Sequence, residues 1–338
     1  MVLPDKPANS WRRPQEASGR ETCTRPAATQ SASGRYVGKT SMLPYAQTLG
    51  PVTADKSCNG SGGNPSMARL HLNSLWVGPR LDYLERLCLA SARAQGHEFT
   101  LWSYEPDRLA GVPAGTDLRD AAEVMPRERL LHYRDSGSVA LGANLWRIEL
   151  LAKGLGAWVD MDFIFLKPLD FQTDYLFGLE YEGWINNAVI YAPAGSALVH
   201  DLQTIPRPNL VPPWYGPRNR VKFLWRRFRE GPIELEDYPW GTFSAGLLTY
   251  AIKRNRLLPE AQPADTFYPV RYKDALALYE PAPTVEAMLS ERTHAVHMWH
   301  SRLQGLRDAP PAPGTFIDKM CRQFDIDPSL TAEQAANK

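Results

Sequence analysis

The sequence has few cysteines, and none stands in a pattern that binds zinc or builds a disulfide framework. The four cysteines are at positions 23, 58, 88 and 321, with no CxxC pair and no close Cys/His spacing. This arrangement argues against a disulfide-rich secreted domain and against a structural zinc module. We therefore expect a reducing, cytosolic setting.

Long apolar runs are also missing. No segment approaches the roughly 18 uninterrupted apolar residues that indicate a membrane-spanning helix. The amino terminus, MVLPDKPANSWRRPQEASGR, lacks the continuous apolar centre of a signal peptide. We expect no membrane span and a cytoplasmic location, with peripheral contact at the inner face of the membrane as the alternative.

A charge excess of either sign is absent as well. Lys and Arg total 38 and Asp and Glu total 37, which gives a net charge of +1. A net charge this close to zero gives no reason to expect a nucleic-acid partner for the protein as a whole. Any basic surface must therefore be local.

The chain divides into a polar tail and a patterned region. Residues 1–66 are rich in Ser, Gly, Pro, Thr and Ala, and we expect a disordered tail there. From Ala68 the pattern alternates between strands and helices, which predicts an α/β sheet protein with one packed domain over 67–305 and a carboxyl-terminal extension over 306–338. We expect strands at 68–78, 98–103, 157–166 and 184–193, and helices at 80–95, 145–155, 196–205 and 241–255.

Two carboxylates interrupt the apolar segment GAWVDMDFIFLKPL. Asp160 and Asp162 are separated by one residue, so their side chains point to the same side of an extended backbone. Burying two like charges without a counter-charge is costly, and a divalent cation is the simplest compensation. Oxygen ligands suit Mg²⁺ or Mn²⁺, which keep positions open for substrate phosphates. The alternative is that the pair merely ends a strand and caps a turn.

These residues resemble glycosyltransferase family 32, the group that includes α-1,4-galactosyltransferases and α-1,4-N-acetylglucosaminyltransferases. GLGAWVDMDFIFLKPL is similar to the family's GG-(I/V)-Y-x-D-x-D-x-(I/V)-x-L-K-(P/N)-L. The segments ANLWRIELL, INNAVIYAP, WGTFSAGLLT, TFYPVRYKDALALYE and HAVHMWHSRLQG follow in the family's order. The resemblance implies a single catalytic domain of the GT-A type, a Rossmann-like fold that binds a nucleotide-sugar at the carboxyl ends of its strands.

The resemblance also implies roles for individual residues. Asp160 and Asp162 match the metal-binding DXD motif, with Asp162 the stronger candidate for metal ligation, and His297 and Trp299 match the closing H-x-W segment over the metal and diphosphate. The resemblance further implies that His297 joins the aspartates as a metal ligand and that Asn187, towards the donor sugar, joins them as a catalytic residue. The other implied donor-site residues are Asn73 and Trp76 near the base, and Asn144 and Arg147 on the helix before the motif.

The sequence departs from the family's pattern at several positions. Asn144 stands where the family has Asp, Leu155 replaces the first Gly, and Trp158 replaces Tyr. Ser244-Ala245 replaces a Gly-Pro pair that shapes the donor pocket in the family. The diphosphate site is retained, whereas the donor sugar is not specified.

Three histidines stand at positions 294, 297 and 300. On a helix this spacing would bring them near one face and resemble a metal cluster. On a strand, His297 and Trp299 would instead lie on one side. The strand interpretation agrees better with the resemblance.

We therefore expect a metal-dependent hexosyltransferase. The reaction would move a hexose or N-acetylhexosamine from a nucleotide-sugar, a UDP-sugar above all, to a glycan or lipid-linked acceptor with retention of configuration. Surface polysaccharide biosynthesis, including capsule assembly, is the expected setting. The alternatives are a sugar-nucleotide or glycolipid-binding relative without activity and a metal-dependent phosphohydrolase, which generally needs more acidic ligands.

Residues 214–229 form a basic and aromatic stretch with no acidic residue before Glu230. Such a segment can lie on an anionic membrane surface, contact a lipid-linked or sugar acceptor, or form a solvated helix. Nucleic acid is the least favoured partner because no recognised nucleic-acid module accompanies the stretch. The sequence leaves the first three alternatives open.

Overall fold

A computed structural model describes residues 70–336. The tail expected over residues 1–66 lies outside the described residues, as do Cys23 and Cys58. Within residues 70–336, no helix has both the length and the apolar character needed to cross a membrane.

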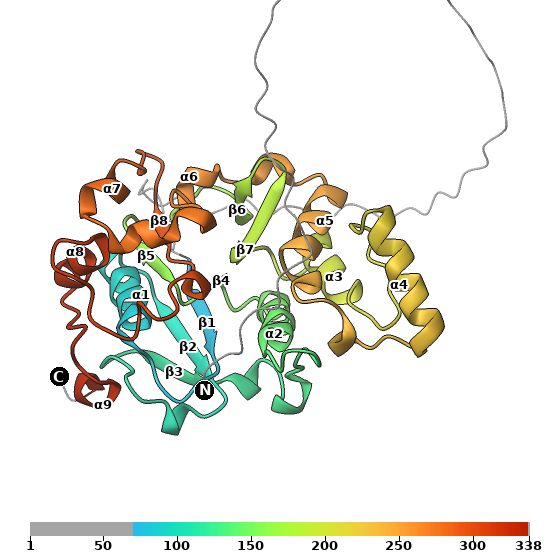
Figure 1. Cartoon of the computed structure of the whole chain (residues 1–338), viewed down its shortest axis with the longest axis horizontal. Helices are drawn as coiled ribbons and strands as arrows, with labels where there is room; N and C mark the ends of the chain where they lie inside the picture. Colours follow the sequence, from blue (N-terminus) through green and yellow to red (C-terminus); the bar gives the residue numbers. More distant parts are fainter. Residues whose placement is uncertain (1–69, 337–338) are drawn as a thin grey trace, which may run out of the picture. The chain divides into compact units, whose positions relative to one another are not determined.

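A six-stranded mixed sheet lies at the centre of this region (Figure 1). Its order is β3-β2-β1-β4-β7-β6, in which β3, β2, β1 and β4 are parallel while β7 and β6 are antiparallel to their neighbours. The strands are β1 (Leu72–Trp76), β2 (Phe99–Ser103), β3 (Asp117–Asp120), β4 (Ala157–Val159), β6 (Leu176–Tyr181) and β7 (Trp184–Tyr191). The expected α/β fold with a Rossmann-like sheet is confirmed.

Two short strands form a separate antiparallel pair. β5 (Phe163–Phe165) pairs with β8 (Ala295–His297), and Phe163 lies opposite His297. All residues of both strands are buried. This pair joins the segment after β4 to a segment near the end of the chain.

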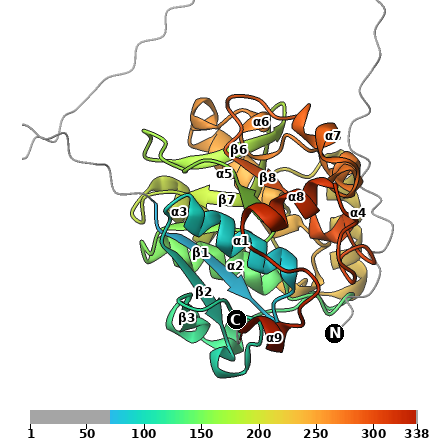
Figure 2. The ribbon, with the colours of Figure 1, turned by 90° about the vertical axis from the view of Figure 1, so that its left-hand side faces the viewer.

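Helices cover both faces of the sheet. In the two views α1 (Tyr83–Ala94) and α2 (Ala140–Ala152) lie on opposite sides of β1 and β2 (Figures 1 and 2). The remaining helices are α3 (Ala197–Thr204), α4 (Pro217–Glu230), α5 (Leu247–Arg254), α6 (Ala264–Phe267), α7 (Ala282–Glu286), α8 (Phe316–Gln323) and α9 (Ala332–Ala336). The central strands are buried on both faces, which explains their apolar sequences.

Local sequence signals set several of these boundaries. The backbone N–H of Asp82 donates to the Glu85 carboxylate at 2.8 Å, which forms part of a capping box at the start of α1. Ser196 accepts from the Val199 N–H at the start of α3. The strand and helix types expected at 68–78, 80–95, 98–103, 184–193 and 196–205 are all confirmed by elements inside those ranges.

Gly156 precedes β4 and permits a close approach between chain segments. Its φ is +115°, and a Cβ on this residue would lie 2.4 Å from the His71 carbonyl oxygen. Only glycine fits such a position without displacing the backbone. The glycine therefore fixes how β4 enters the sheet beside β1.

Two expectations are wrong in detail. The single strand expected over 157–166 is two strands, β4 and β5, which belong to different sheets because the chain turns away from β7 at the acidic pair. The helix expected over 241–255 begins only at Leu247, and Phe243 and Ser244 have non-helical backbone angles. Phe243 is buried against Tyr238, with 4.8 Å between ring centroids, so tertiary packing overrides the helical pattern.

The chain after residue 305 packs into the domain. Phe316, Ile317, Met320 and Cys321 of α8 are buried in the same apolar cluster as β5 and β8. The residue that caps the start of α8, Thr315, accepts from the Asp318 N–H. The extension therefore contributes to the core that supports the acidic pair.

Candidate active site

The acidic pair lies where the order of the parallel strands reverses. From β1 the chain proceeds to β2 and β3 on one side, and then returns to β4 on the other side of β1. Ligands of open α/β sheets bind at the carboxyl ends of the strands at such a reversal. Asp160 follows β4 directly, and its backbone N–H donates to the Ala188 carbonyl of β7 at 2.8 Å. The topology therefore places Asp160 where a ligand is expected.

Asp160 is held by two neighbouring side chains. Its Oδ1 accepts a hydrogen bond from Nε1 of Trp158 at 2.7 Å and lies 3.3 Å from the Arg147 guanidinium. That guanidinium also lies over the Trp158 ring, 4.4 Å from its centroid. Burial raises the pKa of Asp160 by more than Arg147 lowers it. With 31% of its side chain exposed, the carboxylate is oriented and still accessible to a cation.

Asp162 is fixed by the segment that includes β8. Its Oδ2 accepts the His300 backbone N–H at 3.0 Å, and its carbonyl accepts the Met298 N–H at 2.7 Å. Its Oδ1 lies 3.0 Å from Nε2 of His297. Burial acts to raise the pKa of Asp162, but the two histidines outweigh burial and hold this pKa well below its ordinary range. The carboxylate is therefore ionised at neutral pH.

His297 is confined by aromatic rings. Its ring centroid lies 4.1 Å from that of Trp299, 4.7 Å from that of Phe163 and 5.7 Å from that of Tyr268. Burial acts to lower the pKa of His297, but Asp162 dominates and raises it. Packing and charge thus hold the imidazole in one position.

Trp299 supports this imidazole from an unusual backbone conformation. Its φ is +57° and its ψ is +58°, a left-handed conformation that bulky residues rarely adopt. The indole Nε1 donates to the Val270 carbonyl at 2.8 Å, and the ring is buried. Strained residues of this kind persist where surrounding contacts determine them. Trp299 therefore positions His297 in the structure, while its contact with a donor stays a prediction.

Asp160, Asp162 and His297 fit a divalent metal ion. One ligand atom from each residue lies within 4.8 Å of the others. Nε2 of His297 lies 3.0 Å from Oδ1 of Asp162, and Nδ1 has no hydrogen-bond partner among the described residues. Adjacent ligands of an octahedral ion with bonds near 2.1 Å lie about 3 Å apart. The spacing of these side chains is that of ligands that share an ion.

Three more residues implied by the resemblance, Asn144, Arg147 and Asn187, are connected by hydrogen bonds next to Asp160. Arg147 of α2 donates through Nη1 to the Asn187 carbonyl of β7 at 2.5 Å. The Asn187 side-chain amide donates to Oδ1 of Asn144 at 3.1 Å. Arg147 and Asn144 are buried, and burial lowers the pKa of the Arg147 guanidinium. The structure thus joins these three residues to the acidic pair through α2 and β7.

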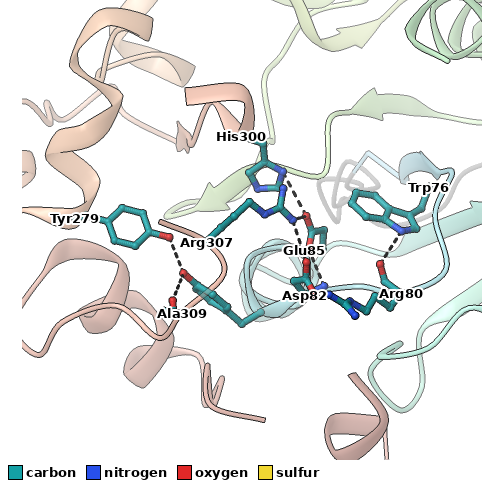
Figure 3. Close-up of polar contacts among 9 residues, drawn as sticks. Trp76, Arg80, Asp82, Glu85, Tyr279, His300, Arg307 and Ala309 are labelled. Atoms are coloured by element: carbon teal, nitrogen blue, oxygen red, sulfur yellow. Dashed lines mark hydrogen bonds and ion pairs between the residues drawn. The ribbon is translucent and has the colours of Figure 1, made fainter. Parts of the chain in front are cut away.

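Asn73 and Trp76 have contacts inside the fold. Asn73 is buried, donates to the Leu155 carbonyl at 2.9 Å and accepts from Nε1 of Trp102 at 2.9 Å, so its amide ties β1 to the turn before β4. Trp76 ends β1 and donates through Nε1 to the Arg80 carbonyl at 2.9 Å (Figure 3). Contact of either residue with a nucleotide base stays a prediction.

Sequence reasoning missed a buried ionic network beside Asp162. Figure 3 shows Asp82, the residue before α1, and Glu85 of α1 facing His300 and Arg307. Fully buried Glu85 accepts from Arg307 at 2.5 Å and lies 3.4 Å from Nδ1 of His300. The His300 backbone N–H in turn holds Asp162. The pattern Asp82-x-x-Glu85 signals a helix start, but nothing in the sequence indicates its distant partners.

Glu180 was also missed. This residue of β6 accepts from the Asn186 side chain at 3.0 Å. Its negative charge helps to raise the pKa of Tyr268, after burial and Asp160, and also helps to raise the pKa of His297, after the two aspartates and against the effect of burial. A third carboxylate therefore acts on the metal-binding side chains, and no local motif marks it.

The outer two of the three histidines have separate environments. His294 lies just before β8, and its Nδ1 is 2.6 Å from the Pro168 carbonyl. His300 starts a short 3₁₀ helix, His300–Arg302, and meets Glu85. The strand interpretation of this segment is confirmed for His297, which ends β8, but not for Trp299, which lies outside the strand with a left-handed backbone.

Comparison with protein-family models and with curated proteins finds no match. Among solved structures, the chain resembles the PaToxG glycosyltransferase with 11% identity and a TM-score of 0.34, over 77% of this chain and 86% of that one. A likeness this remote adds no weight to any activity. Membership of glycosyltransferase family 32 therefore stays a prediction.

Proposed function

We propose that the protein is a metal-dependent glycosyltransferase. It would move a hexose or N-acetylhexosamine from a nucleoside-diphosphate sugar, a UDP-sugar above all, to a glycan or glycolipid acceptor in surface polysaccharide assembly. The observation that carries this proposal is the convergence of Asp160, Asp162 and His297 at the strand-order reversal of the sheet.

The three residues would hold Mn²⁺ or Mg²⁺. When bound, such an ion supplies Lewis-acid stabilisation of negative charge on a leaving diphosphate. The protein prepares its ligands in advance: Trp158 and Arg147 orient Asp160, and the His300 backbone N–H orients Asp162. Preorganised ligands avoid a reorganisation cost when the substrate binds.

Donor contacts would come from the elements around the ligands. Asn144, Arg147 and Asn187 form one connected group next to Asp160, and we assign them to the donor sugar. Trp76, at the carboxyl end of β1, would meet the base, with Asn73 supporting the turn behind it. His297 and Trp299 would cover the diphosphate.

The transfer would retain the anomeric configuration. We assign no side chain as a nucleophile and propose front-face transfer, in which the acceptor hydroxyl approaches from the side that the diphosphate leaves. The protein would act by positioning both reactants, an effect that contributes several kcal/mol (roughly 7–11 at most) in well-oriented reactions. Product analysis by NMR tests this assignment, and an inverted anomer would overturn it.

Donor binding and turnover test the proposal as a whole. Thermal unfolding would be measured with Mn²⁺ and a panel of nucleotide-sugars, because a ligand at about 100 times its Kd stabilises the native state by roughly 2.7 kcal/mol. Asp162→Ala should remove the donor-dependent shift and turnover, whereas Asp135→Asn, an exposed turn residue, should preserve both. Stabilisation without sugar release or transfer would favour the non-catalytic alternative, and undiminished turnover in Asp162→Ala would contradict the proposal.

A further inference from the structure

Helix α4 presents an apolar stripe to solvent. Val221, Leu224, Trp225 and Phe228 are 66%, 50%, 59% and 82% exposed. Their spacing of three and four residues places them on one face, within an arc of about 100° at 3.6 residues per turn. Phe223, on the opposite face, is the buried residue of the helix. The helix therefore packs Phe223 against the domain and turns its apolar stripe outward.

Stacking adds area to this apolar face. The rings of Trp225 and Phe228 lie 6.0 Å apart with an interplanar angle of 29°. Together they form a continuous aromatic surface at the centre of the stripe. Exposed apolar groups that are contiguous, and not scattered singly, mark interaction sites.

Basic residues border the stripe on both sides. The helix carries six basic residues and one acidic residue, Glu230. Helical geometry places Arg218, Lys222 and Arg229 along one edge of the stripe, and Arg220 and Arg227 along the other. All five of these basic residues are exposed.

The acidic groups near α4 do not neutralise these edges. Glu230 and Asp237 pair with Arg226, at 2.8 Å and 4.0 Å, and Arg226 is the basic residue that lies away from the stripe. Asp237 also pairs with Arg134 at 2.7 Å. Arg220 donates to the backbone carbonyls of Tyr215 and Pro213, which are neutral partners and do not cancel its positive charge. The outward face is therefore both apolar and cationic.

We propose that α4 lies in the plane of an anionic lipid membrane and attaches the protein to it. Val221, Leu224, Trp225 and Phe228 enter the boundary between headgroups and acyl chains, and the flanking Arg and Lys side chains meet lipid phosphates. This is the arrangement that amphipathic interfacial helices use, and anionic lipids add electrostatic attraction. The inference is independent of the proposed transfer activity, because α4 contains none of the metal-binding residues.

The combination of charge and apolar surface favours a membrane over a second copy of the protein or a nucleic acid as the partner of α4. In a symmetric contact between two copies of this face, the same patch meets itself and the cationic edges repel. Nucleic acid would satisfy the basic edges, but its phosphates would leave the apolar stripe without a partner. A bilayer interface offers partners for both parts of the face.

Vesicle binding by the full chain tests the proposal. Binding would be measured by co-sedimentation with vesicles of phosphatidylcholine alone and of phosphatidylcholine with phosphatidylserine. We expect binding to the anionic vesicles that weakens with added salt. The double variant Trp225→Ala/Phe228→Ala should lower partitioning by about tenfold or more. Arg218→Gln/Arg229→Gln should lower it by about tenfold on anionic vesicles.

Matched variants control for general surface effects. Leu276→Ala removes an apolar side chain that is 45% exposed outside α4, and Arg108→Gln removes an exposed charge elsewhere. Both should bind vesicles like the unmodified protein. Circular dichroism confirms that all variants are folded, and donor-dependent thermal shifts should not change in the α4 variants.

Three kinds of result would overturn the membrane assignment. The first is vesicle binding without the expected dependence, either equal binding to neutral and anionic vesicles or no effect of the α4 substitutions. The second is a dimer in sedimentation velocity that Trp225→Ala/Phe228→Ala dissociates, without vesicle binding. The third is tight binding of an oligonucleotide, measured by fluorescence anisotropy, that prevents vesicle binding.

Discussion

Nε2 of His297 lies 3.0 Å from Oδ1 of Asp162, although the two residues come from distant parts of the chain. The antiparallel pairing of β5 with β8 brings them together, with Phe163 opposite His297 in register. At this distance the two side chains form an ion pair when His297 is protonated. The same separation suits two side chains that share a divalent ion.

Removing His297 should abolish metal-dependent stabilisation. In the unmodified protein, Mn²⁺ should raise the melting temperature and EDTA should reverse the change, because the ion binds the folded state. His297→Ala should bind Mn²⁺ at least about 100-fold more weakly, because loss of a residue that only orients a metal ligand already weakens binding by roughly 10- to 100-fold. Titration calorimetry measures the affinity, and His200→Ala, a histidine on the distant helix α3, is the control. Equal affinity in both variants would remove His297 from the ligand set.

Replacing Arg147 should destabilise the protein through Asp160. Arg147→Met keeps the length of the buried side chain but leaves the carboxylate without its cation and the Asn187 carbonyl without its donor. Breaking a buried pair from one side costs about 3 kcal/mol. Urea unfolding measures the loss.

The matched control for this prediction is Arg129→Met. Arg129 pairs with Glu149 at 2.9 Å, but its side chain is 61% exposed. Surface pairs contribute about 0–1 kcal/mol. A similar effect of the two substitutions would show that Arg147 does not support Asp160 as the structure indicates.

Glu85 should influence metal affinity without touching the metal. Glu85→Gln removes the negative charge that faces Arg307 and His300, and His300 carries the backbone N–H that orients Asp162. We expect a decrease in Mn²⁺ affinity of about tenfold, typical of outer-shell changes. Glu105→Gln breaks the surface pair with Arg127 and should leave this affinity unchanged. If the Mn²⁺ affinity of Glu85→Gln were unchanged, the contacts of Glu85 with Arg307 and His300 would support the fold but not metal binding.

Stability without metal should depend on pH through His297. Burial acts to lower the pKa of His297, but Asp162 raises it above its ordinary value of about 6.5. The stabilisation by protonated His297 is therefore complete below pH of about 6.5 and is lost as the pH rises through the raised pKa. Asp162 has a lowered pKa, so its contribution is present above pH of about 3.9 and is lost as the pH falls.

Urea unfolding in EDTA at several pH values measures this dependence. The difference in unfolding free energy between the unmodified protein and His297→Gln should shrink as the pH rises above about 6.5. Metal binding requires the neutral imidazole, so the apparent Mn²⁺ affinity should rise over the same interval. A difference that stays constant with pH would contradict the His297–Asp162 ion pair.

The sequence by itself determined the kinds of elements and the candidate carboxylates. The periodic spacing of apolar residues is a local signal, and it predicted the types of β1, α1, β2, β7 and α3. Asp160 and Asp162 stood out because charge inside an apolar segment needs compensation. These inferences needed only neighbouring residues.

Tertiary structure decided the rest. The turn between β4 and β5, the late start of α5 at Leu247 and the burial of Asn73 follow from contacts with distant segments. The same is true of Glu85, whose cap motif is visible in the sequence while its contacts with His300 and Arg307 are not. Local patterns specify how a segment folds, but only packing decides which distant side chains share a site and which face of α4 remains in solvent.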